Sequence, residues 1–165
     1  MNKSNLKSYA PQARKDFIAA VTARANLLGL SETAGTLEVA PAQTQGDVTV
    51  IAGQAWPAKV SGQRDQLIER IRKDGFAHTM EAVAYTWFNR FAALRYMELH
   101  DYLGHGHRAL SSTSGGLPDI LTHATDLTSE LPGLNATKVT ELKLAGNRDG
   151  ELYRMLLVAQ CNALS

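Results

Sequence analysis

Residues 76–103 read FAHTMEAVAYTWFNRFAALRYMELHDYL and contain neither glycine nor proline. Apolar side chains recur at steps of four and three residues, at Met80, Ala84, Trp87, Phe91 and Leu94, which is the spacing of one face of an α-helix. Small side chains make a second stripe, so neighbouring helices can pack on two sides. The stretch predicts a long central helix over about 76–103, surrounded by a helical bundle.

Shorter stretches with helical spacing lie on both sides of this segment. They cover about 11–28 and 63–74 before it, and about 118–129, 135–145 and 149 onward after it. The fold class is therefore predicted to be mainly α. The predicted core consists of the large apolar side chains Phe17, Trp87, Phe88, Phe91 and Leu94.

A change of composition interrupts the helices between residues 31 and 62, where charge thins out and threonine, valine and glycine become frequent. Residues 36–39 and 47–51 alternate in the manner of short β-strands, and residues 41–46 would link them. We expect a small β-hairpin insertion over about 36–52.

The composition is that of one ordinary folded domain covering 1–165. Hydrophobic residues make up 44% and charged residues 20%, which excludes intrinsic disorder. No stretch approaches the roughly 20 apolar residues of a membrane span, and the first residues lack the apolar segment of a signal peptide. A single cysteine, Cys161, cannot form an internal disulfide, so we expect a cytoplasmic protein without membrane contact.

The charge is balanced overall but uneven along the chain. Seventeen basic and 16 acidic residues give a net charge of +1, which excludes a polycation that holds nucleic acid by bulk charge. The first 30 residues, however, carry one acidic residue, Asp16, against five basic ones: Lys3, Lys7, Arg14, Lys15 and Arg24. These five are candidates for contacts with DNA phosphates; a solvated helix face is the alternative interpretation.

Few residues suggest catalysis or metal binding. His100, His105 and His107 lie close together in sequence and could bind zinc, but a typical zinc site pairs two short ligand clusters, so we assign no metal ligand. Glu98 follows Arg95 by three residues on the apolar face, which favours an ion pair. The sequence contains neither a nucleophile elbow nor a phosphate-binding glycine loop.

Four blocks carry a resemblance to a known family. They read LKSYAPQARKDFI (6–18), AYTWFNRF (84–91), LRYMELHDYL (94–103) and, from 151 to 164, ELYRMLLVAQCNAL. Together they resemble the amino-terminal region of the PglX (BrxX) family, the adenine-specific DNA methyltransferases of type 1 BREX phage-defence systems. The resemblance implies a single amino-terminal helical domain of a longer chain, and the apolar run that continues to Ser165 agrees with this.

The resemblance also limits what this chain can do. The family transfers a methyl group from S-adenosylmethionine to a flipped-out adenine, and its catalytic signature is of the Asn-Pro-Pro-Tyr type. None of the five prolines here follows an asparagine, and no two are adjacent. The catalytic domain is therefore absent, no catalytic or cofactor-binding residue can be carried over, and we expect no cofactor and no methyl transfer by this chain alone.

Three roles remain open at this point. The first is a non-catalytic scaffold or docking module with DNA-backbone contacts, whose partners would be the rest of the methyltransferase chain, other BREX proteins or a phage inhibitor. The second is a direct DNA-binding module that acts through the basic amino-terminal helix. The third is a metal-binding enzyme that uses the cluster of His100, His105 and His107.

Overall fold

The computed structural model describes residues 3–164, with side chains from Tyr9 onward. Contacts within the chain group its residues into two compact units, residues 1–88 (unit 1) and residues 89–165 (unit 2). The boundary falls inside one helix, α3 (Phe76–Leu99). Each unit is described by itself below, and the single domain expected for 1–165 stays a prediction.

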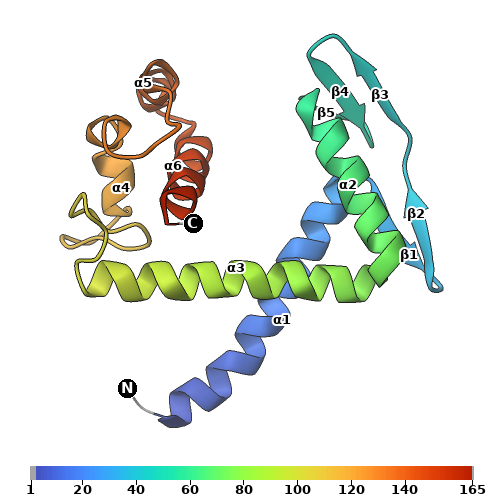
Figure 1. Ribbon diagram of the computed structural model, residues 1–165, viewed down its shortest axis with the longest axis horizontal. Helices are drawn as coiled ribbons and strands as arrows, with labels where there is room; N and C mark the ends of the chain where they lie inside the picture. Colours follow the sequence, from blue (N-terminus) through green and yellow to red (C-terminus); the bar gives the residue numbers. More distant parts are fainter. Residues whose placement is uncertain (1–2, 165) are drawn as a thin grey trace. The chain divides into compact units, whose positions relative to one another are not determined.

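Helices predominate among the elements of the described chain and the strands are short, which agrees with the mainly α prediction (Figure 1). Unit 1 holds α1 (Lys3–Leu27), five strands, α2 (Lys59–Asp74) and the first half of α3. Unit 2 holds the second half of α3, α4 (Asp119–Thr122), the 3-10 helix η1 (Asp126–Thr128), α5 (Ala136–Ala145) and α6 (Asp149–Ala163). No helix in the described part is both long and apolar enough to span a bilayer.

The first helix is longer than the sequence suggests, because α1 continues through Pro11 to Lys3. It ends at Leu27, and Gly29 in the turn that follows has a φ of +67°, which is unfavourable for residues with a Cβ. A Cβ at this position would also lie 2.7 Å from the Cβ of Ala40. Gly29 therefore permits both the turn out of the helix and the close approach of the following strands.

The strands occur where the sequence places them, but the single hairpin over 36–52 is wrong. β2 (Thr36–Val39) pairs with β1 (Leu30–Thr33), and β4 (Val48–Ile51) pairs with β3 (Ala42–Gln45) and with β5 (Gln54–Pro57), all antiparallel. The expected linker at 41–46 is thus mostly strand. The cause lies in two tight Ala-Gly turns at 34–35 and 52–53, where both residues have positive φ, the conformation that joins adjacent strands most compactly.

Helix α2 connects the strands to the core of unit 1. Ile68 and Ile71 of α2 pack with Ala25, Leu30, Phe76 and Met80, and Figure 1 shows α2 beside the sheet that ends in β5. Arg64 is also buried on α2, and its Nε donates to the Leu28 carbonyl at 2.7 Å. A buried arginine is tolerated here because backbone oxygens satisfy its guanidinium.

Helix α3 confirms the long helix predicted over 76–103, although it ends at Leu99 instead of Leu103. The helix ends before Asp101, which has a φ of +56°. Leu94 is buried, whereas Phe17, Trp87, Phe88 and Phe91 are half-buried. In unit 1 the rings of Phe17 and Phe88 meet edge to face at 5.7 Å. Whether α3 is the centre of one bundle stays a prediction.

Unit 2 has its own core, built on α6. Leu152 and Leu156 of α6 are fully buried with Val139 and Leu142 of α5 and with Ile120 of α4. The helix expected at 118–129 is two short pieces, α4 and η1. Cys161 lies in this core, and burial raises the pKa of its thiol despite the charge of Arg90.

Candidate functional site

The basic residues of α1 were the first sequence-predicted site, and the structure separates those that it describes. Arg14 forms an ion pair with Glu81 of α3, and the Arg24 guanidinium lies 4.6 Å from the ring centroid of Trp56. Lys15 is exposed. Nine residues, or about two and a half helical turns, put Lys15 and Arg24 on opposite sides of the helix. The side chains of Lys3 and Lys7 lie outside the described ones.

An apolar groove runs between α1 and the first half of α3, entirely within unit 1. Its volume is about 380 Å³. Phe17 and Ile18 of α1 and Tyr85 and Phe88 of α3 contribute to its lining, and Tyr85 remains 66% exposed. The ion pair of Arg14 with Glu81 also lies at this groove. Apolar grooves edged by charge are typical of surfaces that receive a partner.

His100, His105 and His107, which the sequence offered as a possible zinc cluster without an assigned ligand, do not form one group. The His100 ring packs against two tyrosines, with centroid distances of 4.3 Å to Tyr96 and 5.7 Å to Tyr102. Both tyrosines are exposed. His100 therefore belongs to an aromatic cluster at the end of α3.

His105 stabilises the loop after α3 through hydrogen bonds of both its ring nitrogens. The backbone N–H of His107 donates to Nδ1 of His105 at 3.1 Å. In the neutral ring the proton then sits on Nε2, which donates to Oε1 of the buried Gln160 at 2.5 Å. Both nitrogens of His105 are thus engaged, and the residue anchors the loop to α6.

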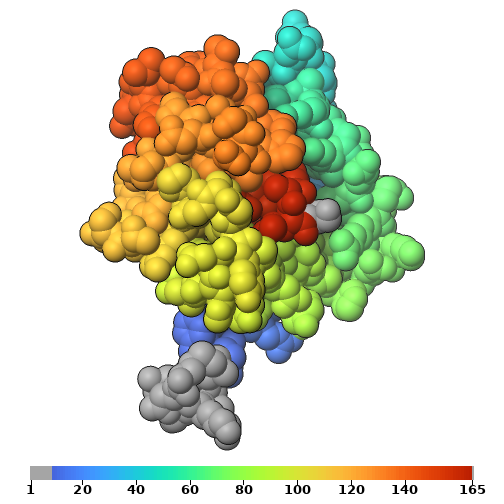
Figure 2. All heavy atoms as spheres, turned by 60° about the vertical axis from the view of Figure 1, so that its left-hand side comes forward, coloured from blue at the N-terminus to red at the C-terminus, as the bar shows by residue number. Residues whose placement is uncertain are grey.

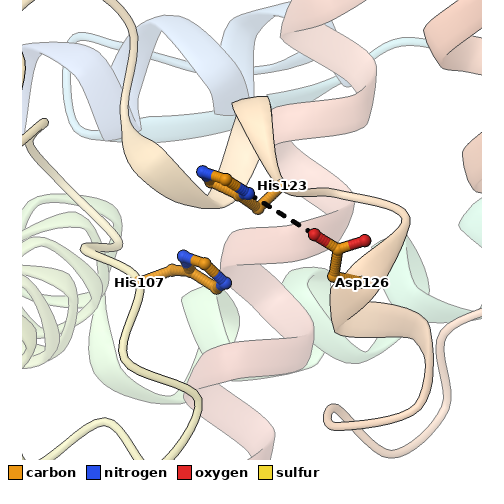
Figure 3. Close-up of side chains that lie close together, drawn as sticks. All are labelled: His107, His123 and Asp126. Atoms are coloured by element: carbon orange, nitrogen blue, oxygen red, sulfur yellow. Dashed lines mark hydrogen bonds and ion pairs between the residues drawn. The ribbon is translucent and has the colours of Figure 1, made fainter.

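His107 lies against two residues that the sequence analysis did not single out, His123 and Asp126 (Figure 3). The rings of His107 and His123 stack at 4.2 Å with an angle of 12°, and His123 Nδ1 lies 3.4 Å from Asp126 Oδ2. One ligand atom from each of the three residues falls within 4.8 Å of the other two. Burial, together with the nearby His123 and His105, lowers the pKa of His107, which favours the neutral, metal-binding form of its imidazole.

A pattern in the sequence could have indicated part of this cluster. His123 and Asp126 are three residues apart, the spacing that brings side chains together over one helical turn. Nothing local links them to His107, which precedes His123 by 16 positions. That contact depends on tertiary structure.

Glu98 is the most buried carboxylate in the described chain, and it organises the same loop. It accepts hydrogen bonds from Arg95 at 2.5 Å, from the Leu110 backbone N–H at 2.7 Å and from the Ser111 hydroxyl at 2.9 Å. Burial alone would raise the pKa of Glu98, but these hydrogen bonds outweigh it and lower the pKa. The expected ion pair with Arg95 is present, and it is part of a structural network.

The amino-acid sequence was also compared with known proteins. No protein-family model matches the chain. The chain is 44% identical over 167 residues to the adenine-specific methyltransferase BrxX of Escherichia coli O9:H4 (strain HS), an alignment that covers 99% of this chain and 14% of that protein. It is 28% identical over 179 residues to the adenine-specific methyltransferase PglX of Lacticaseibacillus casei (strain Zhang), covering 100% of this chain and 15% of that protein.

These similarities run along the chain from one end to the other, yet they involve a small part of each relative. The chain spans about one seventh of the length of the curated relatives that it matches. The resemblance inferred from the four sequence blocks is thus confirmed: over nearly its whole length, the chain is related to one segment of the BrxX and PglX adenine-specific methyltransferases.

Proposed function

We propose that the chain is a non-catalytic amino-terminal module of a longer adenine-specific DNA methyltransferase of BREX phage defence. The module docks onto the remaining methyltransferase chain, which binds S-adenosylmethionine and acts in the cytoplasm. The observation that carries this proposal is the 44% identity to BrxX over 99% of the chain, combined with only 14% coverage of BrxX. The absence of an Asn-Pro-Pro-Tyr type motif from the sequence supports a non-catalytic role.

The α1–α3 groove of unit 1 supports docking as the role of the module. Tyr85 exposes two thirds of its surface beside Phe17 and Phe88, and exposed aromatic side chains contribute strongly to protein interfaces. The Arg14–Glu81 pair supplies both signs of charge next to this apolar surface. Such a surface suits a partner segment that brings an apolar side chain with polar groups beside it.

A chimera tests this proposal. In full-length E. coli BrxX, the matched segment is replaced by this chain, and adenine methylation of DNA is measured. The chimera is expected to methylate. Tyr85→Glu in the chimera should reduce methylation at least tenfold, because the docked segment would cover the groove and bury a carboxylate there. Tyr96→Glu is the matched control, since Tyr96 is an exposed tyrosine of the same helix outside the groove.

Two results would contradict docking through the groove. An inactive chimera would show that this chain cannot replace the matched segment of BrxX. Equal methylation by the Tyr85→Glu and unaltered chimeras would show that the groove is not the docking surface.

A second candidate function is direct contact with DNA phosphates through α1. The helix carries five basic residues and one acidic residue, and Lys15 is exposed on it. This function predicts binding of duplex DNA by the isolated chain that weakens steeply with salt, because each phosphate contact releases counterions. Lys15→Ala should weaken binding, whereas Lys73→Ala, at an exposed lysine of α2, should not. No binding even at low salt would exclude this function for the isolated chain.

A further inference from the structure

We propose that His107, His123 and Asp126 form a binding site for a divalent transition-metal ion, with Zn²⁺ as the best-fitting ion. Two imidazole nitrogens and one carboxylate oxygen are a common set of protein ligands for zinc, and a water molecule would complete four-coordination. None of these three residues lines the groove or belongs to α1. The metal site can therefore be tested independently of the proposed docking role.

Backbone hydrogen bonds hold the two segments that carry these ligands side by side. The Ile120 N–H donates to the Arg108 carbonyl at 3.1 Å, and the Asp119 N–H donates to the Ser111 carbonyl at 3.0 Å. Figure 2 shows the result at the surface, where the loop after α3 (yellow) lies against the segment that carries α4 (light orange). Because these hydrogen bonds join backbone groups, they hold His107 next to α4 without any contribution from side chains.

Helical geometry then places the other two ligands. The His123 N–H donates to the Asp119 carbonyl at 2.9 Å as the last bond of α4, and the Asp126 N–H donates to the His123 carbonyl at 3.0 Å. His123 and Asp126 consequently project on the same side, and Figure 3 shows the His123 ring over the His107 ring with the Asp126 carboxylate beside His123. His105, bonded to Gln160 and to the backbone of His107, fixes the position from which His107 reaches them.

The ligand atoms need a modest adjustment to bind an ion. Zinc–nitrogen bonds of about 2.0–2.1 Å in a tetrahedron bring ligand atoms to about 3.3 Å from one another, and those of the three residues lie within 4.8 Å. The stacked rings must turn so that one nitrogen of each points toward Asp126. The side chains of His123 and Asp126 are 45% and 65% exposed, so solvent gives them room to turn.

A bound ion would clamp the loop after α3 onto the α4–η1 segment. His107 and His123 are 16 positions apart in sequence, and an ion shared by both closes that stretch of chain. Two neutral imidazoles and one carboxylate leave a bound Zn²⁺ with a net charge of +1, which favours an anionic or water ligand at the remaining position.

The test uses the 165-residue chain with any histidine tag removed and with metals stripped by a chelator. Titration calorimetry with ZnCl₂ at pH 7.5 is expected to give one site per chain, and Co²⁺ is expected to give the visible absorption of a tetrahedral site. His123→Ala and Asp126→Asn should each weaken zinc binding at least tenfold. Because both residues are exposed, the variants should fold, and far-ultraviolet circular dichroism checks this.

His100→Ala is the matched control, since His100 is the histidine of the aromatic cluster and not of the proposed site. It should bind zinc as the unaltered chain does. A second readout is the midpoint of thermal unfolding, which should rise with zinc concentration in the unaltered chain and not in His123→Ala. Absence of stoichiometric binding by the unaltered chain, or equal binding by His123→Ala, would overturn the proposal.

Discussion

Arg64 of α2 donates a hydrogen bond from Nε to the backbone carbonyl of Leu28, 2.7 Å away. Its Nη2 also donates to the Ala40 carbonyl at 2.5 Å. One buried side chain therefore joins the end of α1 and the link between β2 and β3 to α2. The stability of unit 1 should depend on this contact.

Replacing Arg64 by alanine should lower the free energy of unfolding of unit 1 by about 3 kcal/mol, because two carbonyls lose a charged donor. Urea unfolding followed by tryptophan fluorescence measures this selectively, since both tryptophans, Trp56 and Trp87, belong to unit 1. Arg70→Ala, at a largely exposed arginine of the same helix, is the control and should cost less than about 1 kcal/mol. An equal loss of unfolding free energy in the two variants would show that Arg64 does not join these three segments.

Gly29→Ala should destabilise unit 1 by about 2 kcal/mol or more. The added Cβ would require a strained backbone at φ +67° and would meet Ala40 at 2.7 Å. Gly62→Ala is the opposite case, because Gly62 lies in α2 with open space around it; it should be neutral or stabilise by up to about 1 kcal/mol. The same urea titration measures the free energy of unfolding of both variants. An unchanged free energy in Gly29→Ala would show that the turn after α1 can relax to accept a Cβ.

Glu98→Gln should destabilise unit 2 by about 2 kcal/mol at pH 7, because a buried carboxylate that accepts three hydrogen bonds loses its charge. The folded-state pKa of Glu98 is lowered, so its contribution is complete above its ordinary pKa and is lost as pH falls through the folded-state value. The difference between the two proteins should therefore shrink at low pH.

Amide hydrogen exchange in α5 and α6 measures the stability of unit 2 at pH 7 and in acid. Glu130→Gln, at an exposed glutamate of the same unit, should show no such loss at pH 7. If the difference between Glu98→Gln and the unaltered chain grew as pH fell, the direction assigned to the pKa of Glu98 would be wrong.

Leu94→Ala should cost about 3 kcal/mol in unit 2, the usual penalty for removing a fully buried leucine. Trp87→Ala should cost unit 1 less than the about 3–5 kcal/mol of a fully buried aromatic residue, because Trp87 is only half-buried. Hydrogen exchange measures both. A larger loss for Trp87→Ala than for Leu94→Ala would point to a central role for the middle of α3.

Local sequence patterns predicted the positions of helices and strands better than they predicted which strands pair. The four-and-three spacing from Met80 to Leu94 identified α3, because helical periodicity is a property of neighbouring residues. The strands predicted at 36–39 and 47–51 are present, the second from Val48, but their pairing was predicted wrongly. Pairing depends on the turns at Ala34-Gly35 and Ala52-Gly53, and alanine at the first turn position is a weak signal for a positive φ.

The candidate metal site shows the same limit at the level of side chains. Of the three histidines near the end of α3, only His107 lies in the proposed site. His123 joins it through the backbone bond of Ile120 to Arg108, a tertiary contact that no spacing rule contains. Likewise, the positive charge near the amino end was visible in the sequence, but the engagement of Arg14 by Glu81 and of Arg24 by Trp56 was not.

The position of the unit boundary within α3 has a practical consequence for dissecting the chain. A cut between Phe88 and Asn89 would separate two sets of contacts but would sever a continuous helix. Each fragment would then expose a new helix end with up to four unpaired N–H or C=O groups. Fragments that overlap through the whole of α3 keep that helix intact, so they are the appropriate pieces for asking whether either half folds on its own.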